Sequence, residues 1–363
     1  MNINFSAPIC STGYGIASLN ILKKLHSLSG GHLSLFPIGQ ISVQNQSDYN
    51  LCELCVDNAE DFDLHAAYIK IWHQFDLAQR IGRGKYYSYS FFELDTLSNK
   101  EIKHLNIPDH IFASSEWAKS IISNHNIKTD ISVVPLGVDR NIFDEQKYPI
   151  EKPYEKYAFL NIGKWEIRKG HDILLDLFQK AFPTEQDVEL WIVAAEHTNG
   201  YSKEAELKQW KAMYMVDPRI RICTGVEDQS QIAQIISESS CGLYPSRAEG
   251  WNLELLETMS MNRPVITTNY SSHTEFCTKE NSFLVDIDET ETAYDGKAFL
   301  GQGKWAKIGV DQKDQIIEHM RHAYKTRVNT NESGVLTSQK YSWMNSALSM
   351  YGVLSNAASL SCS

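Results

Sequence analysis

The chain has 363 residues, too many for one compact core and about right for two domains. Its hydrophobic content of 42% and charged content of 22% are typical of an ordinary soluble globular protein. The net charge of −11 argues against nucleic-acid binding, which needs a basic face, although a few local donors can still hold a nucleotide.

The first half alternates short apolar strands with helical patterns. A strand begins at Ile3, a turn follows at STGYG, and residues 17–28 place apolar side chains at helical spacing. The segments AAYIKIWH, KYYSYSFFELD, HIFASSEWAKSII and ISVVPLGVD continue the pattern. Residues 145–157 are polar, contain two prolines and interrupt it, so we interpret them as a linker.

A second alternating series begins with a strand at 157–163. It continues with a helix at 171–181, the strands VELWIVAAE and RIRICTG, a helix near 229–239 and the strand CGLYPS. Residues 286–308 break the series and are interpreted as an inserted loop. The last helical pattern, near 339–355, is amphipathic and is expected to pack back across both domains.

Alternating strands and helices predict parallel sheets covered on both faces. The fold class is therefore α/β, with two doubly wound Rossmann-like domains facing one another across a cleft. Ligands are expected there, at the carboxyl ends of the strands. The predicted boundaries are 1–148 for the first domain, 149–338 for the second, and 339–363 for a crossover helix and tail.

Three cations lie in the predicted strand-to-helix loop GKWEIRKG: Lys164, Arg168 and Lys169. At such a loop they would neutralise a diphosphate and stabilise it as a leaving group. The alternative is a solvated basic turn, because surface Lys and Arg are common.

Residues 244–269, YPSRAEGWNLELLETMSMNRPVITTN, read as the end of one strand, a loop, a helix and a second strand. The amides of residues 246–253 and the helix dipole can receive phosphate oxygens. Glu249 lies in the loop and Glu257 about one turn into the helix, where carboxylates can accept hydroxyl donors. The spacing of the two glutamates is not informative alone, because many helices carry such pairs. Their position in a strand–loop–helix segment is what predicts a nucleotide site.

These segments resemble the retaining GT-B glycosyltransferases of family 4. SRAEGWNLELLETMSMNRPVITTN is similar to the motif P-S-x-x-E-G-F-G-x-x-x-L-E-A-M-A-x-G-x-P-V-I of that family. FLNIGKWEIRKGHDILL, ISVVPLGVDRNIF and SQKYSWMNSA resemble three further elements, and all four fall in order across most of the chain.

The resemblance implies a role for each matching residue. It assigns the leaving diphosphate to Lys164 and Lys169, the donor sugar to Glu249, and the nucleotide ribose to Glu257. It also implies an acceptor-side first domain and a nucleotide-sugar-binding second domain. Further donor contacts are implied at the glycine loop, the basic loop and the amides between the two glutamates, namely Gly13, Gly15, Arg168, Gly250, Trp251, Asn252 and Leu253.

Four positions depart from the family motif. Lys164 replaces an arginine, which removes bidentate phosphate geometry. Asn252 replaces the second glycine of the turn, and asparagine tolerates unusual backbone angles. Glu254 replaces a proline and adds a carboxylate that the motif lacks. Thr258 replaces the small residue that follows the second glutamate of the motif, which is a minor change.

The acceptor side carries fewer signals. Glu93, at the end of SYSFFELD, matches a glutamate of part of the family and is predicted to line the acceptor cleft, although it could be an ordinary surface carboxylate. His73 is a rival polar candidate at another strand end, although a satisfied interior or rim histidine is favoured there. Glu275 matches a glutamate that is frequent in the family, although it could simply cap or brace its loop. Trp305 and Trp343 are expected to be packing residues.

The predicted activity is that of a hexosyltransferase-type retaining enzyme in polysaccharide biosynthesis. It would move a sugar from a nucleotide-diphosphate donor to a hydroxyl of a glycan, polysaccharide or lipid-linked acceptor. No enzymic nucleophile and no Asp-x-Asp in the cleft segments are evident, so we expect no cofactor and no obligatory metal. The alternative is a catalytically weak nucleotide-sugar-binding regulatory or partner protein. A Rossmann oxidoreductase is excluded, because neither domain opens with G-x-G-x-x-G followed by an acid.

The expected location is the cytoplasm. No apolar run approaches the roughly 20 residues that span a bilayer, and MNINFSAPICSTGYG has no signal-peptide character. Peripheral contact with a membrane-borne acceptor stays open, and no nucleic-acid partner is expected. Cys52 and Cys55 form a lone C-x-x-C, which is better explained by thiols in a reducing compartment than by zinc.

Overall fold

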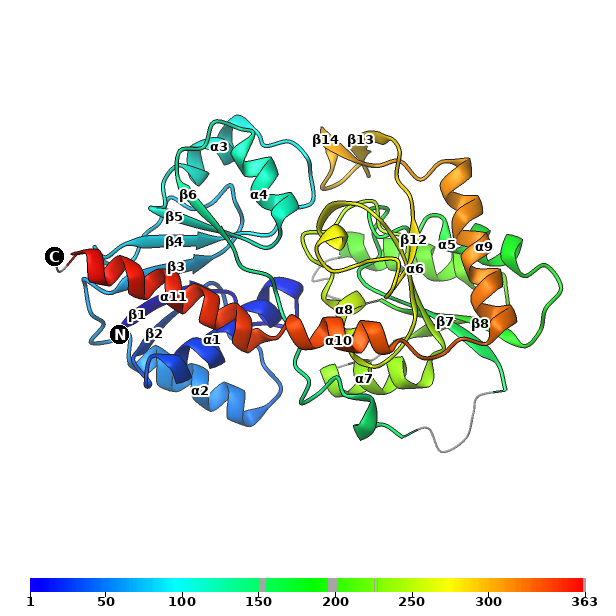
Figure 1. Ribbon diagram of the computed structural model, residues 1–363, viewed down its shortest axis with the longest axis horizontal. Coiled ribbons are helices and arrows are strands. Elements are labelled where there is room, and N and C mark those ends of the chain that lie inside the picture. Colours follow the sequence, from blue (N-terminus) through cyan, green and yellow to red (C-terminus); the bar gives the residue numbers. More distant parts are fainter. Residues whose placement is uncertain (150–154, 195–200, 225, 227, 362–363) are drawn as a thin grey trace. The chain divides into compact units, whose positions relative to one another are not determined.

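The computed structural model describes residues 1–149, 155–194, 201–224, 226 and 228–361 (Figure 1). The chain forms two compact units. One comprises Met1–Asp139 together with the segment from Lys340 onward, and the other comprises Arg140–Gln339. Much of the predicted linker, residues 150–154, lies outside the described residues, as do the ends of VELWIVAAE and RIRICTG.

The first unit is built on a six-stranded parallel sheet in the order β2-β1-β3-β4-β5-β6. The inner strands β1 and β4 are buried along their whole length, as expected for a parallel sheet covered on both faces. The strands are β1 (Ile3–Ala7), β2 (Leu33–Pro37), β3 (Ala67–Ile71), β4 (Tyr86–Tyr89), β5 (His110–Ala113) and β6 (Asp130–Val133). The helices of its N-terminal segment are α1 (Gly13–Leu28), α2 (Gln46–Asp57), α3 (Asn99–Leu105) and α4 (Glu116–Ser123).

The C-terminal helix α11 (Trp343–Ser361) completes this first unit by packing on α1 (Figure 1). Its start is fixed to the segment after β6, because the Val138 amide donates to the carbonyl of Tyr341 at 3.0 Å. The approach is close: a Cβ on Gly137 would lie 2.2 Å from the amide nitrogen of Trp343. The predicted return of the C-terminal helix to the first domain is confirmed.

The second unit has its own six-stranded parallel sheet, in the order β12-β11-β10-β7-β8-β9. The chain runs outward from β7 in one direction and from β10 in the other, so the switch point lies between these two strands. The strands are β7 (Tyr157–Ile162), β8 (Val188–Val193), β9 (Ile220–Cys223), β10 (Cys241–Tyr244), β11 (Val265–Thr268) and β12 (Phe283–Val285). The helices are α5 (Leu174–Ala181), α6 (Tyr201–Tyr214), α7 (Gln229–Glu238), α8 (Leu253–Ser260), α9 (Val310–Thr326) and α10 (Glu332–Lys340).

The predicted α/β class with two doubly wound domains is confirmed, while the prediction of an inserted loop at 286–308 is wrong. That segment contains an antiparallel hairpin of β13 (Thr290–Tyr294) and β14 (Leu300–Ala306). Most of its strand residues are exposed or only half-buried, so the sequence is polar and resembles a loop. Short 3₁₀ turns at Glu145–Lys147 and Ser271–Glu275 complete the described elements.

Candidate functional site

The loop after β7 and the loop after β10 meet at the switch point of the second sheet. The Arg247 amide donates to the carbonyl of Arg168 at 2.7 Å, which joins the two loops. Gly170 has φ +82°, and a Cβ there would lie 2.5 Å from the carbonyl oxygen of Pro245. A glycine is therefore required for this close approach.

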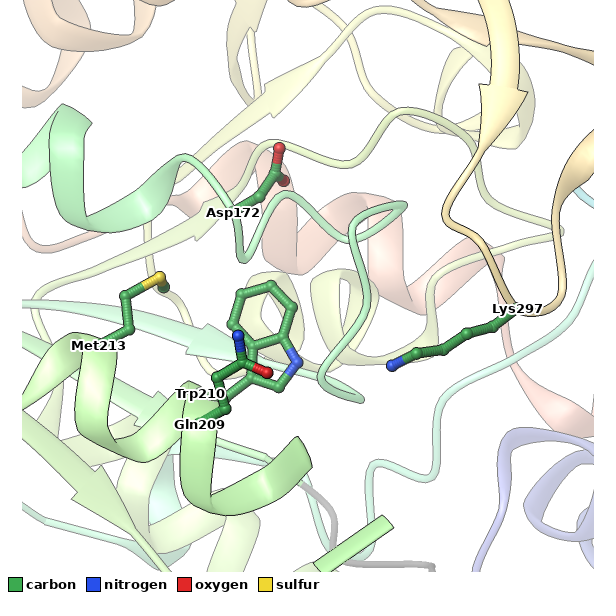
Figure 2. Close-up of a pocket in the computed structure, with 5 residues that line it drawn as sticks. All are labelled: Asp172, Gln209, Trp210, Met213 and Lys297. Carbon is green, nitrogen blue, oxygen red and sulfur yellow. The ribbon is translucent and has the colours of Figure 1, made fainter. Parts of the chain in front are cut away.

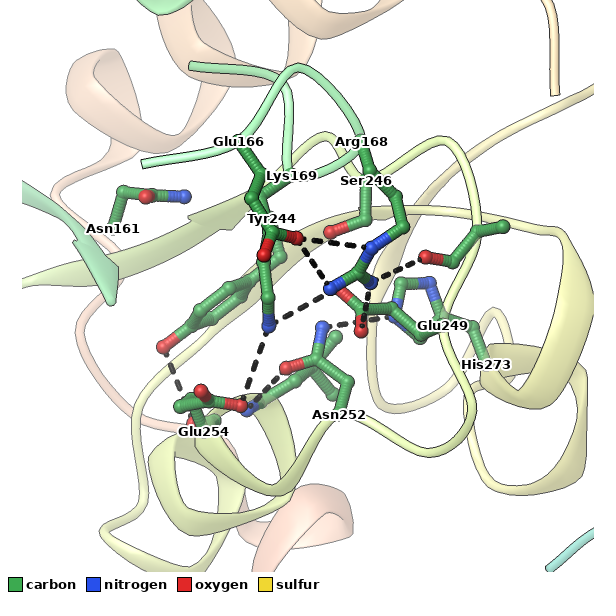
Figure 3. Close-up of polar contacts among 12 residues, drawn as sticks. Asn161, Glu166, Arg168, Lys169, Tyr244, Ser246, Glu249, Asn252, Glu254 and His273 are labelled. Carbon is green, nitrogen blue, oxygen red and sulfur yellow. Dashed lines mark hydrogen bonds and ion pairs between the residues drawn. The ribbon is translucent and has the colours of Figure 1, made fainter. Parts of the chain in front are cut away.

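A buried ion cluster lies where these loops meet (Figure 3). The Lys169 ammonium lies 3.1 Å from Glu249 Oε1 and 3.6 Å from Glu254 Oε2. Arg168 Nη1 lies 2.7 Å from Glu249 Oε2. The exposed fractions of Arg168, Lys169 and Glu249 are 6%, 7% and 4%. The structure thus brings together three of the side chains predicted for the donor site.

Burial and pairing act in opposite directions on the charges of this cluster. Burial would raise the pKa of Glu249, but Arg168 and Lys169 outweigh it and lower that pKa to about 2. Burial would lower the pKa of Lys169, but the carboxylates of Glu249 and Glu254 outweigh it and raise that pKa. Both groups are therefore charged at neutral pH.

The two other predicted cations differ in their surroundings. Arg168 also donates to Glu166 Oε2 at 2.8 Å and to the carbonyl of Ala248 at 2.8 Å, so it braces the loop that carries Glu249. Lys164 is exposed and acts on the cluster through its charge. Burial would raise the pKa of Glu166, but the charges of Arg168 and then Lys164 outweigh it and lower that pKa. Within the described residues, Lys164 makes no ion pair of its own.

Asn252 caps helix α8 and holds the turn before it in an unusual backbone conformation. Its φ is +81°, in the left-handed region, and its side-chain oxygen accepts from the Leu255 amide at 3.3 Å. Its Nδ2 contacts His273 Nε2 at 2.9 Å, while His273 Nδ1 lies 3.0 Å from the carbonyl of Thr268. Burial lowers the pKa of His273 to about 4, so the neutral ring donates from Nδ1 and accepts from Asn252.

The residues around Asn252 are also buried. Trp251 packs against Phe276, with ring centroids 4.9 Å apart, and the carbonyl of Gly250 accepts from Ser272 Oγ at 2.8 Å. Leu253 is the first residue of α8 and is 8% exposed. The predicted donor segment therefore forms a packed, rigid corner.

Glu257 lies in α8, one turn beyond the helix start, and is 6% exposed. Burial raises its pKa well above the usual value for glutamate, and the carboxylate of Glu254, three residues earlier on the same helix face, raises it further. The structure thus places this carboxyl in the helix, as predicted.

Several polar groups at the same sheet edge were not found from the sequence. Ser246 Oγ and Asn161 Oδ1 are buried and have no hydrogen-bond partner in the described part of the chain. Asn161 uses its Nδ2 to donate to the carbonyl of Leu243 at 2.6 Å. Buried polar atoms are rarely left unpaired, so these two are candidates for ligand contacts.

Arg247 is a structural residue that the sequence reading missed. It is 7% exposed and binds both carboxylate oxygens of Asp172 at 2.8 Å. Its Nε lies 3.3 Å from Glu291 of the hairpin, which also accepts from Trp305 Nε1 at 3.2 Å. Arg247 therefore fixes the hairpin to the two loops, and Trp305 is a packing residue as predicted.

A pocket of about 310 Å³ lies beside these loops (Figure 2). None of the residues lining it is a predicted site residue: they are Asp172, Gln209, Trp210, Met213 and Lys297. Trp210 stacks on Trp165 with ring centroids 5.9 Å apart, which fixes the basic loop against α6. The pocket is thus a neighbour of the ion cluster and not its centre.

In the first unit, the predicted glycine loop starts helix α1. A Cβ on Gly13 would meet no other atom within 4 Å, whereas a Cβ on Gly15 would lie 2.1 Å from the carbonyl oxygen of Cys10. Gly15 is therefore required for packing within the loop. Tyr14 between them exchanges hydrogen bonds of 2.9 and 2.8 Å with the backbone of Phe91.

The predicted acceptor residues lie near this tyrosine. Glu93 is half-buried, and its charge is one cause, after burial, of the raised pKa of Tyr14. His73 packs between Tyr14 at 4.9 Å and the ring of Phe75 at 5.0 Å. An aromatic environment of this kind agrees with the packed rim position expected for His73.

Other sequence hypotheses concern thiols, metals and membranes. Cys52 and Cys55 are free and buried in α2, and burial raises the pKa of each thiol, to about 11 and about 12. Cys362 lies outside the described residues. In the described ranges, no group of three potential ligand side chains is arranged to hold a metal ion. None of the helices described combines the length and apolar character needed to cross a bilayer.

Comparison with known proteins connects this geometry to a group of enzymes. Residues 156–297, which contain the ion cluster, match the family model described as Glycosyl transferases group 1. An MMP α-(1→4)-mannosyltransferase of Mycolicibacterium hassiacum is 22% identical over 238 residues, covering 63% of this chain and 53% of the relative. An uncharacterised glycosyltransferase of Methanocaldococcus jannaschii is 23% identical over 176 residues, covering 44% and 40%. The chain thus spans about half the length or less of these curated relatives.

Solved structures resemble the whole chain. A sucrose-phosphate synthase of Thermosynechococcus elongatus has a TM-score of 0.70 at 13% identity, covering 99% of this chain and 100% of its own. Anabaena HepE in complex with UDP-glucose has a TM-score of 0.69 at 15% identity, covering 98% and 100%. At such low identities the likeness establishes the GT-B fold alone.

Proposed function

We propose that the protein is a retaining glycosyltransferase that moves a sugar from a nucleotide-diphosphate donor to a hydroxyl acceptor. The carrying observation is the buried cluster of Lys169, Arg168 and Glu249 at the start of α8. A lysine and a helix N-terminus at one point form a site for a leaving diphosphate. The family-model match over 156–297 and the two relatives named as glycosyltransferases support this proposal.

The proposed roles follow from what each side chain contacts. Lys169 would take the charge of the departing phosphate, and Glu249, held by Arg168, would accept hydroxyl donors of the transferred sugar. Each carboxylate oxygen of Glu249 already has one cationic partner and keeps a further lone pair for a hydroxyl. Glu257 would bind the ribose, and Ser246 Oγ and Asn161 Oδ1 would find partners in the bound donor.

In the proposed reaction, the bond between the anomeric carbon and the diphosphate oxygen breaks, and its electron pair stays on the diphosphate. The acceptor oxygen attacks from the same face, and its proton passes to the departing phosphate oxygen. Lys169 and the α8 dipole stabilise the charge without an obligatory metal ion. A glycan, polysaccharide or lipid-linked acceptor would be bound near Glu93, in the unit that carries the glycine loop.

The test is donor binding and turnover across a panel of UDP-, GDP- and ADP-sugars. We expect one donor class to raise the melting temperature and to release its nucleoside diphosphate when acceptor is present. Lys169→Ala and Glu257→Ala should abolish both effects. Lys325→Ala, which removes an exposed lysine of α9, should not. Wild-type behaviour of Lys169→Ala and Glu257→Ala would refute the assigned site.

The second candidate is a protein that binds a nucleotide sugar without transferring it. The ion pair between Lys169 and Glu254 favours this candidate, because it occupies the ammonium that would stabilise the leaving group. This candidate would be supported if a donor raised the melting temperature but no nucleoside diphosphate was released. The release assay would include oligosaccharide and lipid-linked acceptors.

A further inference from the structure

We infer that Glu254 is an intramolecular competitor for the leaving phosphate: it occupies Lys169 in the free protein and must be displaced by donor or product. The inference rests on the proposed function, since that function assigns the phosphate to Lys169. It deepens that function by naming a residue that sets how tightly the diphosphate is held.

The charges around Lys169 are already balanced before a ligand arrives. The buried cations Arg168 and Lys169 face three carboxylates, those of Glu166, Glu249 and Glu254, and the exposed Lys164 supplies the third positive charge. An incoming diphosphate therefore meets no excess positive charge at this point. To gain the buried ammonium of Lys169, it must replace one of the two carboxylates on it.

Glu254 is the carboxylate that can leave. Glu249 has a side chain only 5% exposed and is held by Arg168 at 2.7 Å. The Glu254 side chain is 29% exposed, and its contact with Lys169 is longer, at 3.6 Å. Partly exposed ion pairs of this length are weak, so a phosphate can displace the Glu254 carboxylate toward solvent.

The helix need not change when this side chain moves. The carbonyl of Glu254 accepts from Thr258 Oγ1 at 2.7 Å and from the Tyr244 hydroxyl at 3.2 Å, which holds the backbone. Glu254 lies in the first turn of α8, where the helix dipole favours a carboxylate in either position.

The test compares Glu254→Gln with wild type by isothermal titration. UDP, GDP and ADP are titrated, each alongside its nucleoside, which carries no phosphate. We expect Glu254→Gln to lower the Kd of the bound nucleoside diphosphate about two- to fivefold and to slow its dissociation. The Kd of the nucleoside should not change. Glu318→Gln, which removes an exposed carboxylate of α9, is the matched control and should bind like wild type.

The outcomes separate this inference from the proposed function. If the wild type binds a nucleoside diphosphate and Glu254→Gln does not lower its Kd, the inference is overturned and the function stands. The same holds if Glu254→Gln lowers the Kd of the nucleoside by an equal factor. Binding to Glu254→Gln but not to wild type supports the inference. If neither the wild type nor Glu254→Gln binds any of the diphosphates, the inference and the proposed function are both overturned. Glu254→Ala serves as a second variant, and melting curves confirm that each protein is folded.

Discussion

Asn252 offers a direct test of how the turn before α8 is built. Alanine at this position would remove the helix cap, remove the partner of His273 Nε2, and retain a φ of +81°. Glycine would remove the same two contacts but accept the backbone angle. The positive φ costs alanine about 1–2 kcal/mol, and its poorer capping about 0.5 kcal/mol more. The larger unfolded-state entropy of glycine offsets about 0.5–1 kcal/mol of this difference.

We therefore expect Asn252→Ala to be less stable than Asn252→Gly by about 0.5–2 kcal/mol. Both should be less stable than wild type, because they leave a buried nitrogen of His273 unpaired at a cost of about 1–3 kcal/mol. Urea unfolding followed by circular dichroism and tryptophan fluorescence measures these differences, with the transition of each unit fitted separately.

A matched pair at Asn126 isolates the backbone contribution. Asn126 also has a positive φ, +56°, but is exposed and lies in the other unit. Asn126→Ala should be less stable than Asn126→Gly. Neither variant should lose the stability that the Asn252 variants lose by leaving His273 Nε2 unpaired. If Asn252→Ala were as stable as Asn252→Gly, the turn would not depend on a left-handed residue, and the reasoning would be refuted.

Three further predictions concern the same loops. Burial holds the pKa of His273 near 4, whereas an unfolded histidine takes up a proton near pH 6.5, so its contribution to stability is full above pH 6.5 and is lost as the pH falls toward 4. His273→Gln should flatten the pH dependence of the free energy of unfolding, measured with urea, by up to about 1.4 kcal/mol per pH unit over this range, and parallel curves would contradict the assignment. Gly170→Ala should lower the melting temperature and abolish nucleotide binding, because its Cβ would collide with the Pro245 carbonyl; unchanged binding would show that Lys169 does not depend on this turn. Arg247→Met should reduce the free energy of unfolding by about 2–3 kcal/mol by leaving Asp172 unpaired, and a loss below 0.5 kcal/mol in urea unfolding would contradict the bracing role.

The sequence predicted those parts of the fold and site that depend on local pattern. The buried strands β7 and β10 are continuous apolar runs, and the loops after them contain the Lys169 and Glu249 that the motifs marked. Parallel strands place such loops at one sheet edge, so their meeting could be anticipated. Asn252 caps helix α8 at a φ of +81°, an angle that the tolerance of asparagine for unusual backbone conformations allowed for.

What the sequence did not predict depends on pairing between distant segments. Arg247 and Asp172 are 75 positions apart, and Glu291 of the hairpin is 44 positions from Arg247. Nothing in the local spacing marks these partners. The contact of Glu254 with Lys169 was missed for the same reason: a carboxylate in a first helical turn is ordinary, and only the fold brings the lysine to it.

The first unit is discontinuous in the chain, and this affects the order in which the protein can form during synthesis. Its sheet is complete once β6 has emerged, but α1 stays uncovered on the face that α11 will occupy until the last helix has left the ribosome. The second unit, from Arg140 to Gln339, is continuous and can close earlier. A nascent chain would therefore leave the side of α1 that α11 covers exposed until residues 343–361 emerge, after the whole second unit has been made.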